Sequence, residues 1–387
     1  MIAYNTEGLD NKNIQGQAER ALAEHTITSE EHAAILTACP VPFYTPNFFI
    51  RIGLFLLTVV IVLCSGGLLT LMVNSIGDSL AILLFFTGLI CIGVLEYLVY
   101  GKRHFRSGAD DALLWLAAGL IFAGIDLFAS HITDLQLWIL AFVMACWCTL
   151  RYADRIMALA AFGSFLGILF YTIGEWGGSG RLLLPFSIMA ASAVTGWLAA
   201  DFHNRHRYRH YRDCLVLLRA ATLLTFYGAG NIIIVREWQI SFFGWRAAAN
   251  TPHLLEVFFW AWSLIIPLLY LVRGILKKDR IFLWMGLAGV GAAIYTIRYY
   301  HPMLPLEWAM AIGGAALITL SYSLISYLRK PRSGFTFQKE PDTDPIATPQ
   351  LESLLIAETF PPATPPAADG FQFGGGTGGG GGAGGQY

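Results

Sequence analysis

The sequence predicts an all-α membrane protein, a polytopic bundle of about ten transmembrane helices with both termini in the cytoplasm. The chain is 56% hydrophobic and only 13% charged, whereas soluble domains carry about 25% charged residues. Its apolar residues gather in runs close to the length of about 20 residues that crosses a bilayer. Most of its 25 Lys and Arg residues fall in alternate connections, which fixes the direction of the spans.

Net charge and motif content narrow the function classes. The net charge of −1 predicts no nucleic-acid partner. None of the six cysteines lies in a connection that we place outside, so no disulfide framework is expected. No cleavable signal peptide is recognisable, and we expect the first span to direct insertion. No phosphate loop, nucleophile elbow or zinc-protease motif occurs, and no cofactor is predicted.

Residues 1–47 predict a small cytoplasmic helical element. One helix is expected from Gln17 to Glu24. A second begins at Thr28, where Thr-Ser-Glu-Glu fits a capping box, and ends at about Thr37. Because two short helices with few large apolar residues form a weak core, we expect them to dock on another part of the protein.

Residues 48–328 predict the transmembrane bundle. Short connections between its segments predict that neighbouring helices pack against each other. Glycines at close-packing spacings predict close helix–helix approaches, and Pro267 predicts a kink. These glycines are Gly163 with Gly167, Gly286 with Gly289 and Gly291, and Gly313 with Gly314. The ten expected spans are Ile52–Val73, Leu80–Tyr100, Ala112–Ser130, Leu135–Leu150, Arg155–Ile173, Leu182–Ala200, Cys214–Val235, Leu254–Val272, Ile281–Ile297 and Leu306–Leu328.

The central segment, Asp201–Asp213, is the densest run of positive charge. Such a segment stays out of hydrocarbon, and basic short connections lie on the cytoplasmic side. We expect its arginines to bind anionic lipid headgroups, each contributing about 1 kcal/mol near the surface. These arginines are Arg205, Arg207, Arg209 and Arg212.

The same segment leaves a metal site open as an alternative. If the segment continues as one helix, His203, His206, His210 and Asp213 fall on one face. His206 and His210, four residues apart, could share a zinc ion with Asp213 behind them. A single helix does not surround a metal, however, and the sequence shows no second cluster of ligands.

Three ionisable residues fall inside the expected spans, where each is a candidate functional group by default. They are Glu96, Asp126 and Arg219. Glu96 and Arg219 lie at similar depth near the cytoplasmic face, so we expect them to pair. Asp126 lies near the outer end of its span. Because none lies at the midplane, an ion-coupled carrier is disfavoured.

Residues 329–387 predict a disordered cytoplasmic tail, Pro-rich and acidic at first and Gly-rich at its end. Within it, Leu351–Phe360 places leucines at helical spacing. This stretch is either a docking helix for a protein partner or a transient helix in a linker.

Two stretches carry a resemblance to a known kind of protein. Thr45–Gly53 and Ser107–Gly119, with the short helical pair before them, resemble uncharacterised bacterial multi-pass inner-membrane proteins grouped as domains of unknown function. The resemblance covers roughly residues 15–130. It implies a location in the bacterial cytoplasmic (inner) membrane and a transmembrane bundle behind a helical pair, and it implies no activity.

Three functional hypotheses follow. The first is a non-enzymatic scaffold or sensor that works through its cytoplasmic arms, since the spans carry little charge. The alternative is a transporter or flippase for a lipid-like or hydrophobic solute, because ten spans exceed what an anchor needs. The third is a metal-dependent membrane enzyme that uses His203, His206 and His210.

Overall fold

The computed structural model describes residues 2–72, 78–128, 132–243 and 252–300, with scattered positions between 314 and 326. The described part is helical, and its only bridge between extended residues joins Tyr44 to His104. The predicted tail and its Leu351–Phe360 stretch lie outside the described residues.

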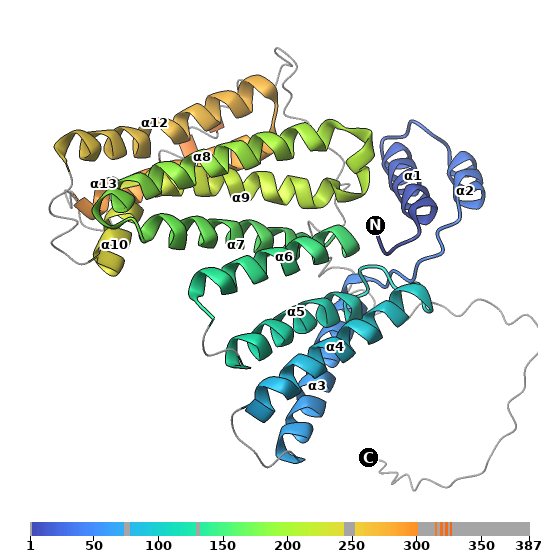
Figure 1. Ribbon diagram of the computed structural model, residues 1–387. Coiled ribbons are helices and arrows are strands. Elements are labelled where there is room, and N and C mark those ends of the chain that lie inside the picture. Colours follow the sequence, from blue (N-terminus) through green and yellow to red (C-terminus); the bar gives the residue numbers. More distant parts are fainter. Residues whose placement is uncertain are drawn as a thin grey trace, which may run out of the picture. The chain divides into compact units, whose positions relative to one another are not determined.

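The helices follow one another with short connections (Figure 1). In chain order they are α1 (Thr6–Ala23), α2 (Ser29–Ala38), α3 (Phe48–Met72), α4 (Asp78–Tyr100), α5 (Ala109–Phe128), α6 (Asp134–Tyr152), α7 (Arg155–Gly174), α8 (Gly177–Asn204), the 3-10 helix η1 (His206–Tyr211), α9 (Arg212–Gly230), α10 (Ile232–Phe243), α12 (His253–Lys277) and α13 (Arg280–Tyr300).

Nine helical stretches in the described part are long and apolar enough to cross a membrane. They overlap the first nine predicted spans, although the seventh lies at His206–Gly230 and not at Cys214–Val235. The tenth, Leu306–Leu328, lies almost wholly outside the described residues. The fold is therefore an all-α polytopic bundle, and the chain is a multi-pass membrane protein. Consecutive helices pack as the pairs α4–α5, α6–α7, α8–α9 and α12–α13.

Glycines bring two of these pairs close together. A Cβ at Gly124 of α5 would lie 2.7 Å from the backbone nitrogen of Phe85 in α4. In α13, a Cβ at Gly286 would lie 2.8 Å from the nitrogen of Leu271, and Gly289 faces Pro267 of α12. The predicted close approach is confirmed at Gly286 and Gly289, where small residues at the helix interface allow it, and at Gly167, where a Cβ would lie 2.5 Å from the Trp138 ring. It is not seen at Gly163, Gly291 and Gly314, where a Cβ would meet no atom of the described residues within 4 Å, and Gly313 lies outside the described residues.

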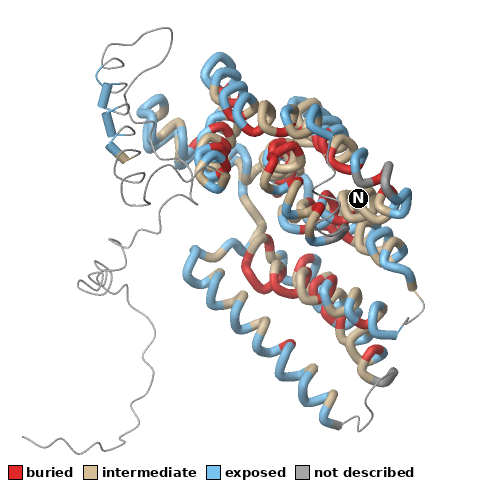
Figure 2. Tube along the Cα trace, turned by 90° about the vertical axis from the view of Figure 1, so that its left-hand side faces the viewer, coloured by how far each residue is buried: buried red, intermediate tan, exposed pale blue. Residues whose placement is uncertain are grey.

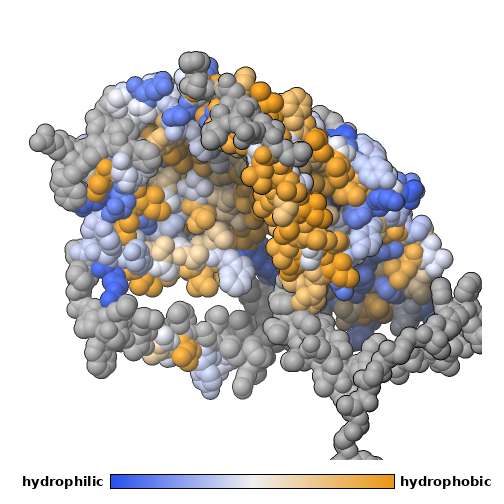
Figure 3. Space-filling view, turned by 90° about the horizontal axis from the view of Figure 1, so that it is seen from below, coloured by the Kyte–Doolittle hydropathy of each residue, from blue (hydrophilic) through white to orange (hydrophobic). Residues whose placement is uncertain are grey.

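Helix α3 turns its apolar side chains outward. Only 6% of its most apolar stretch is buried, and Leu56, Leu57 and Ile61 are more than half exposed. Its tube is pale blue along most of its length (Figure 2). The face seen from below likewise carries a broad area of apolar side chains (Figure 3). Apolar side chains on the outside are what a helix in contact with lipid requires.

The N-terminal arm, residues 2–39, contains α1 and α2. The prediction for α2 is confirmed, including the Thr28 capping box. Helix α1 begins eleven residues before the predicted Gln17, since Asn5 caps it by accepting a hydrogen bond of 2.9 Å from the Glu7 nitrogen. The two helices are tied by Gln15, whose side chain donates to the Cys39 carbonyl at 2.8 Å.

The seventh predicted span, Cys214–Val235, is broken in the structure. Helix α9 ends at Gly230, Asn231 is extended with ψ 127°, and α10 follows as a separate helix. The Asn231 side chain starts α10 by accepting a hydrogen bond from the Ile233 nitrogen at 3.0 Å. The prediction of one continuous span was wrong here, because both pieces are apolar and hydropathy does not register a break.

Polar side chains from three helices satisfy the groups freed by this break. Asn231 donates to Tyr227 Oη at 3.0 Å and to Thr296 Oγ1 of α13 at 3.2 Å. Ser263 Oγ of α12 accepts from the Ile232 nitrogen at 3.0 Å. A broken helix is tolerated at membrane depth when surrounding protein supplies such partners.

A candidate functional site at the charged end of the bundle

One end of the bundle gathers most of the ion pairs in the described part of the chain. We call it the charged end. It comprises the N-terminal arm, the α4–α5 and α6–α7 connections, and the end of α8 with η1 and the first turn of α9. These segments lie together on the right of Figure 1. The largest cluster of buried apolar residues in the described ranges lies beside them and includes Tyr4, Phe105, Leu114 and Tyr152.

The first residues of the arm are built into this core. Tyr4 is 8% exposed, and its ring meets the Phe105 ring edge-on at 4.9 Å between centroids. The backbone nitrogen of Ala3 donates to the Arg151 carbonyl at the end of α6, at 2.7 Å. Burial, together with the charge of Asp110, raises the pKa of Tyr4 above its ordinary value, so the phenol stays neutral. The expected docking is therefore seen for the first residues of the arm, whereas the described packing of α2 is with α1.

Asp10 of α1 forms a bidentate ion pair with Arg209 of η1. Arg209 donates from Nε to Oδ1 at 2.6 Å and from Nη2 to Oδ2 at 2.5 Å. Two parallel bonds of this kind are the strongest geometry for an arginine and a carboxylate. The bonds from Arg209 lower the pKa of Asp10. The pair joins the arm to the central segment.

Asp213, in the first turn of α9, joins two further segments. Its Oδ2 accepts from Arg106 of the α4–α5 connection at 2.7 Å and from Arg155 of α7 at 2.6 Å. The Arg106 guanidinium also lies over the Phe105 ring, 5.3 Å from its centroid. One carboxylate therefore ties the α4–α5 connection, α7 and α9 together.

The predicted pair between Glu96 and Arg219 was wrong. Glu96 accepts two hydrogen bonds of 3.0 Å from Arg151 and one of 2.7 Å from the Tyr152 hydroxyl, both at the end of α6. Arg219 instead donates to Asp279 in the connection between α12 and α13. The sequence placed both residues near the same ends of their spans, but it does not reveal which neighbours they contact.

The start of α5 holds two carboxylates that the predicted span left outside. Asp110 is 2% exposed and accepts from the Ser107 nitrogen and hydroxyl at 2.8 and 3.0 Å, while its second oxygen has no hydrogen-bond partner among the described residues. Asp111 pairs with Arg51 of α3 at 2.5 Å. Gly108, with φ 92°, lets this turn approach the Arg51 carbonyl. Ser-x-x-Asp before an apolar run was the signal available for this capping turn.

The central segment is not one helix. Helix α8 ends at Asn204, Arg205 is extended, and η1 contains non-helical backbone at Tyr208. The shared face predicted for the histidines therefore does not form. No group of three or more His, Cys, Asp or Glu residues in the described part is placed to hold a metal, so the zinc alternative loses its geometric basis.

The positions of the three histidines agree with the loss of a shared face. His206 Nδ1 lies 3.2 Å from an Arg209 nitrogen, and His210 Nε2 lies 3.7 Å from Asp10 Oδ1. His203 is half-buried at the end of α8. Among the predicted headgroup-binding arginines, Arg205 pairs with Asp201 at 2.5 Å and Arg207 is exposed.

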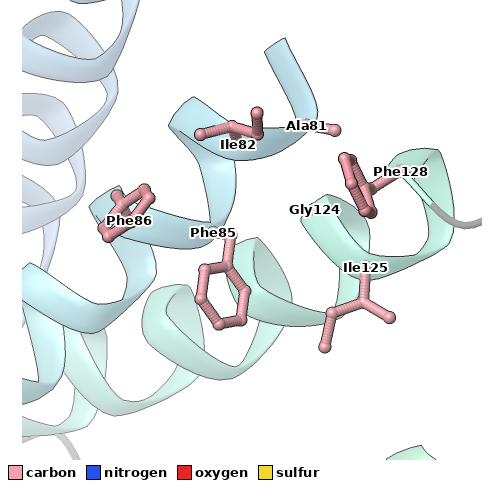
Figure 4. A pocket seen from close by; sticks show the side chains of 7 residues that line it. All are labelled: Ala81, Ile82, Phe85, Phe86, Gly124, Ile125 and Phe128. Carbon is pink, nitrogen blue, oxygen red and sulfur yellow. The ribbon is translucent and has the colours of Figure 1, made fainter. Parts of the chain in front are cut away.

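Asp126 is exposed near the end of α5 that lies away from the charged end. At that same end an apolar pocket of about 280 Å³ opens between α4 and α5, lined by side chains such as Phe85, Phe86 and Phe128 (Figure 4). A second apolar pocket, of about 270 Å³, lies beside the break at Asn231 and is lined by α7, α8, α9 and α10. Neither carries ionisable side chains in its lining.

Under the arm lies a polar pocket of about 210 Å³. It is open to the outside and lined by residues of α1, the α4–α5 connection, η1 and α9. Its charged and polar lining residues are Asp10, Lys12, Asn13, Arg106, Arg209, His210, Arg212 and Asp213. Ile2, Leu9, Phe105 and Ala153 complete the lining, and the pocket belongs to the charged end.

No family model, curated protein or solved structure matches the chain. The class of protein is therefore defined by the fold and by the charged end: a multi-pass helical membrane protein whose N-terminal helical arm is docked by ion pairs on one end of its bundle.

Proposed function

We propose that the protein is a membrane-embedded scaffold or sensor that works through its N-terminal arm. The observation that carries the proposal is the double hydrogen bond between Asp10 and Arg209, which fastens the arm to the central segment. The proposal includes a bacterial inner-membrane location, with the charged end on the cytoplasmic side. Basic connections at that end support this orientation.

One part of the arm contacts the bundle, and the other part, α2, is exposed. Attachment runs through Ala3, Tyr4 and Asp10, which contact the bundle. Helix α2 has no buried residue, and its described helix–helix packing is with α1. An exposed helix held in a fixed place suits contact with a protein partner, whereas the attachment below it provides a means of release.

The ion pair that attaches the arm should weaken when salt or competing charges are added. Asp10 and Arg209 are both about one-third exposed, so salt and competing charges weaken their attraction. Docking of the arm therefore has a small free energy compared with folding of the bundle. A scaffold or sensor needs such a balance, because a ligand shifts an equilibrium only when the two states lie within a few kcal/mol.

A charge exchange tests this proposal. We expect Asp10→Arg or Arg209→Asp to raise amide hydrogen exchange in α1 while exchange in the transmembrane helices stays unchanged. The double variant, which restores opposite charges, is expected to return the protection. Glu30→Arg provides a matched control, because it makes the same charge change on exposed α2. Unchanged exchange of α1 in both single variants would refute arm docking through this pair.

The apolar pocket beside Asn231 supports the alternative function, a transporter or flippase for a lipid-like or hydrophobic solute. It adjoins a broken helix, and broken helices surround the substrate sites of many transporters. Gly228→Leu would partly fill it, and Leu224→Ala on the exposed face of α9 is a control. If proteoliposomes show no movement of labelled lipid above protein-free vesicles, the alternative is excluded.

A protein partner at Leu351–Phe360 stays a separate proposal, since these residues lie outside the described part. Deleting residues 331–387 tests it. If the partner site is there, binding of a purified partner is lost while arm protection stays unchanged.

A further inference from the structure

The pocket under the arm carries more positive than negative charge. Four cationic side chains line it, against the carboxylates of Asp10 and Asp213. Arg209 and Arg106 already bind those two carboxylates. Lys12 and Arg212 have no carboxylate within ion-pair distance among the described residues. The two cations left over make the pocket a site for an anion.

Lys12 is the more unusual of the two. It is half-buried, and its Nζ lies 4.7 Å from the centroid of the Phe105 ring. Burial is the main reason that its pKa falls to about 8, and the charges of Arg106 and Arg51 add to the effect. An ammonium group that is partly desolvated beside other cations destabilises the docked arm. An anion in the pocket would remove that cost.

We propose that this pocket binds a phosphate group, carried either by a lipid headgroup or by a soluble phosphate compound, and that the bound phosphate holds the arm on the bundle. A phosphate monoester carries up to two negative charges and three acceptor oxygens. It therefore matches Lys12 and Arg212 as charges, with the Asn13 amide and the Arg106 guanidinium nearby as further donors. Arginine and lysine are the usual residues that bind phosphate.

The position of the pocket explains how binding would act. Lys12 belongs to α1, whereas Arg106 and Arg212 belong to the bundle. A single anion between them contacts both parts, so it binds the docked arm more tightly than the released arm. By linkage, the ligand stabilises docking by as much as docking strengthens the binding. This inference rests on the proposed function, since it names the ligand to which the arm responds.

The level of the pocket makes a lipid a possible source. It is lined by the α4–α5 connection, by Ala153 between α6 and α7, and by η1 with the first turn of α9. The ends of membrane spans lie at the level of headgroups. A soluble phosphate compound could reach the same place from the aqueous side. The experiment below separates the two sources.

The test uses the full chain in nanodiscs of phosphatidylcholine, with hydrogen exchange of α1 as the measure of docking. Three conditions are compared. The first adds inorganic phosphate, the second adds phosphatidic acid to the bilayer, and the third adds oleate, which supplies negative charge without phosphate. We expect phosphatidic acid or inorganic phosphate to slow exchange of α1, and oleate to have little effect. Protection by phosphatidic acid alone assigns the site to a headgroup, whereas protection by inorganic phosphate assigns it to the phosphate group itself.

Lys12→Gln and Arg212→Gln test the pocket directly. Each should weaken the apparent affinity for the phosphate probe about tenfold, the effect of roughly 1.4 kcal/mol. Lys12→Gln should keep the arm docked without ligand, since it removes an unfavourable charge. Arg20→Gln is the matched control, because Arg20 lies on α1 like Lys12, is exposed and does not line the pocket.

Two failures are distinguishable. If the charge-reversal variants of Asp10 and Arg209 alter the hydrogen-exchange protection of α1 but neither phosphate source does, the phosphate site is refuted and arm docking stands. If phosphatidic acid is retained in native mass spectra by the wild type and lost by Lys12→Gln, yet α1 exchange never changes, the site exists and the arm does not respond to it. That outcome overturns the coupling. Equal phosphate responses in wild type, Lys12→Gln and Arg20→Gln would overturn the assignment of the pocket.

Discussion

Asp10 and Arg209 lie 199 positions apart in the sequence and form two parallel hydrogen bonds of 2.6 and 2.5 Å. Asp10 belongs to a polar helix that precedes the first span, and Arg209 to a 3-10 turn between two spans. This pair therefore joins a helical arm to the most basic connection of the membrane bundle. It also forms one wall of the polar pocket beneath the arm.

Acid should release the arm. Arg209 lowers the pKa of Asp10 from its usual 3.8 when the arm is docked. A carboxylate with a lowered pKa stabilises the docked state above its free pKa, and this contribution is lost as the pH falls through the lowered value. Exchange of α1 should thus rise below about pH 4, and Asp10→Asn should remove that pH dependence. A variant that keeps the full dependence would contradict this role for Asp10.

Alkaline pH should tighten the arm in the absence of an anion. The pKa of Lys12 is about 8 when docked, against 10.5 when free. Between these values the released arm binds more protons than the docked arm, so docking strengthens as the pH rises from about 8 toward 10.5. Lys12→Met should abolish this rise and give strong docking at neutral pH. Hydrogen exchange of α1 measured across this pH range, after correction for the intrinsic exchange rate at each pH, checks this prediction.

Removing the Tyr4 ring should undock the arm. The ring is 8% exposed and packs edge-on against Phe105, and truncating a buried aromatic side chain costs about 3–5 kcal/mol. Tyr4→Ala should therefore expose α1 to proteolysis. Tyr4→Phe keeps the ring and serves as the control, with a change of less than about 1 kcal/mol expected. Proteolysis of Tyr4→Ala at the wild-type rate would show that the ring does not hold the arm.

A double-mutant cycle should show that Glu96 is energetically coupled to Arg151. The two share two hydrogen bonds and are each about a quarter exposed, and bonds to a charged group contribute about 1.5–3 kcal/mol. Glu96→Gln and Arg151→Gln should give a coupling free energy of about 1 kcal/mol or more in thermal or denaturant unfolding. The cycle of Glu96→Gln with Arg219→Gln is the control, for which we expect no coupling.

Loss of the Asn231 side chain should destabilise the α9–α10 break. Asn231 is 3% exposed and bonds to Tyr227, Thr296 and the Ile233 nitrogen. Asn231→Leu leaves the Ile233 nitrogen without its acceptor, which costs about 1–3 kcal/mol. It also removes the amide that donates to the Tyr227 and Thr296 hydroxyls, although both hydroxyls still donate to backbone carbonyls. Unfolding in detergent should show the loss. Asn204→Leu, at the exposed end of α8, makes the same change with little effect expected.

Local patterns in the sequence were sufficient for the helices but not for all their ends. Apolar runs located nine spans, and Thr28 with Glu31 located the start of α2. The early start of α1 depends on Asn5, whose neighbours show no apolar periodicity. The break at Asn231 depends on hydroxyls of α12 and α13, more than thirty residues further along the chain. Sequence windows do not contain such partners.

The candidate site divides in the same way. The central segment was visible as a run of charge, and Glu96 and Arg219 as charges inside spans, whereas Asp110 and Asp111 at the start of α5 were not singled out. Their partners were not visible. Charge and spacing show that a side chain needs a partner, and only the packing of helices decides which one lies within hydrogen-bond distance.

The sequence by itself determined a multi-pass helical membrane protein, with its basic connections gathered on one side and a helical pair before the first span. These properties follow from hydropathy and charge, which act along the chain and survive in the one-dimensional pattern. The tertiary structure decided that the helical pair is clasped by Arg209, that Glu96 pairs with Arg151, and that Lys12 meets Arg106 and Arg212 around one pocket. Those relations join residues far apart in sequence, and only the side-by-side packing of the helices brings them into contact.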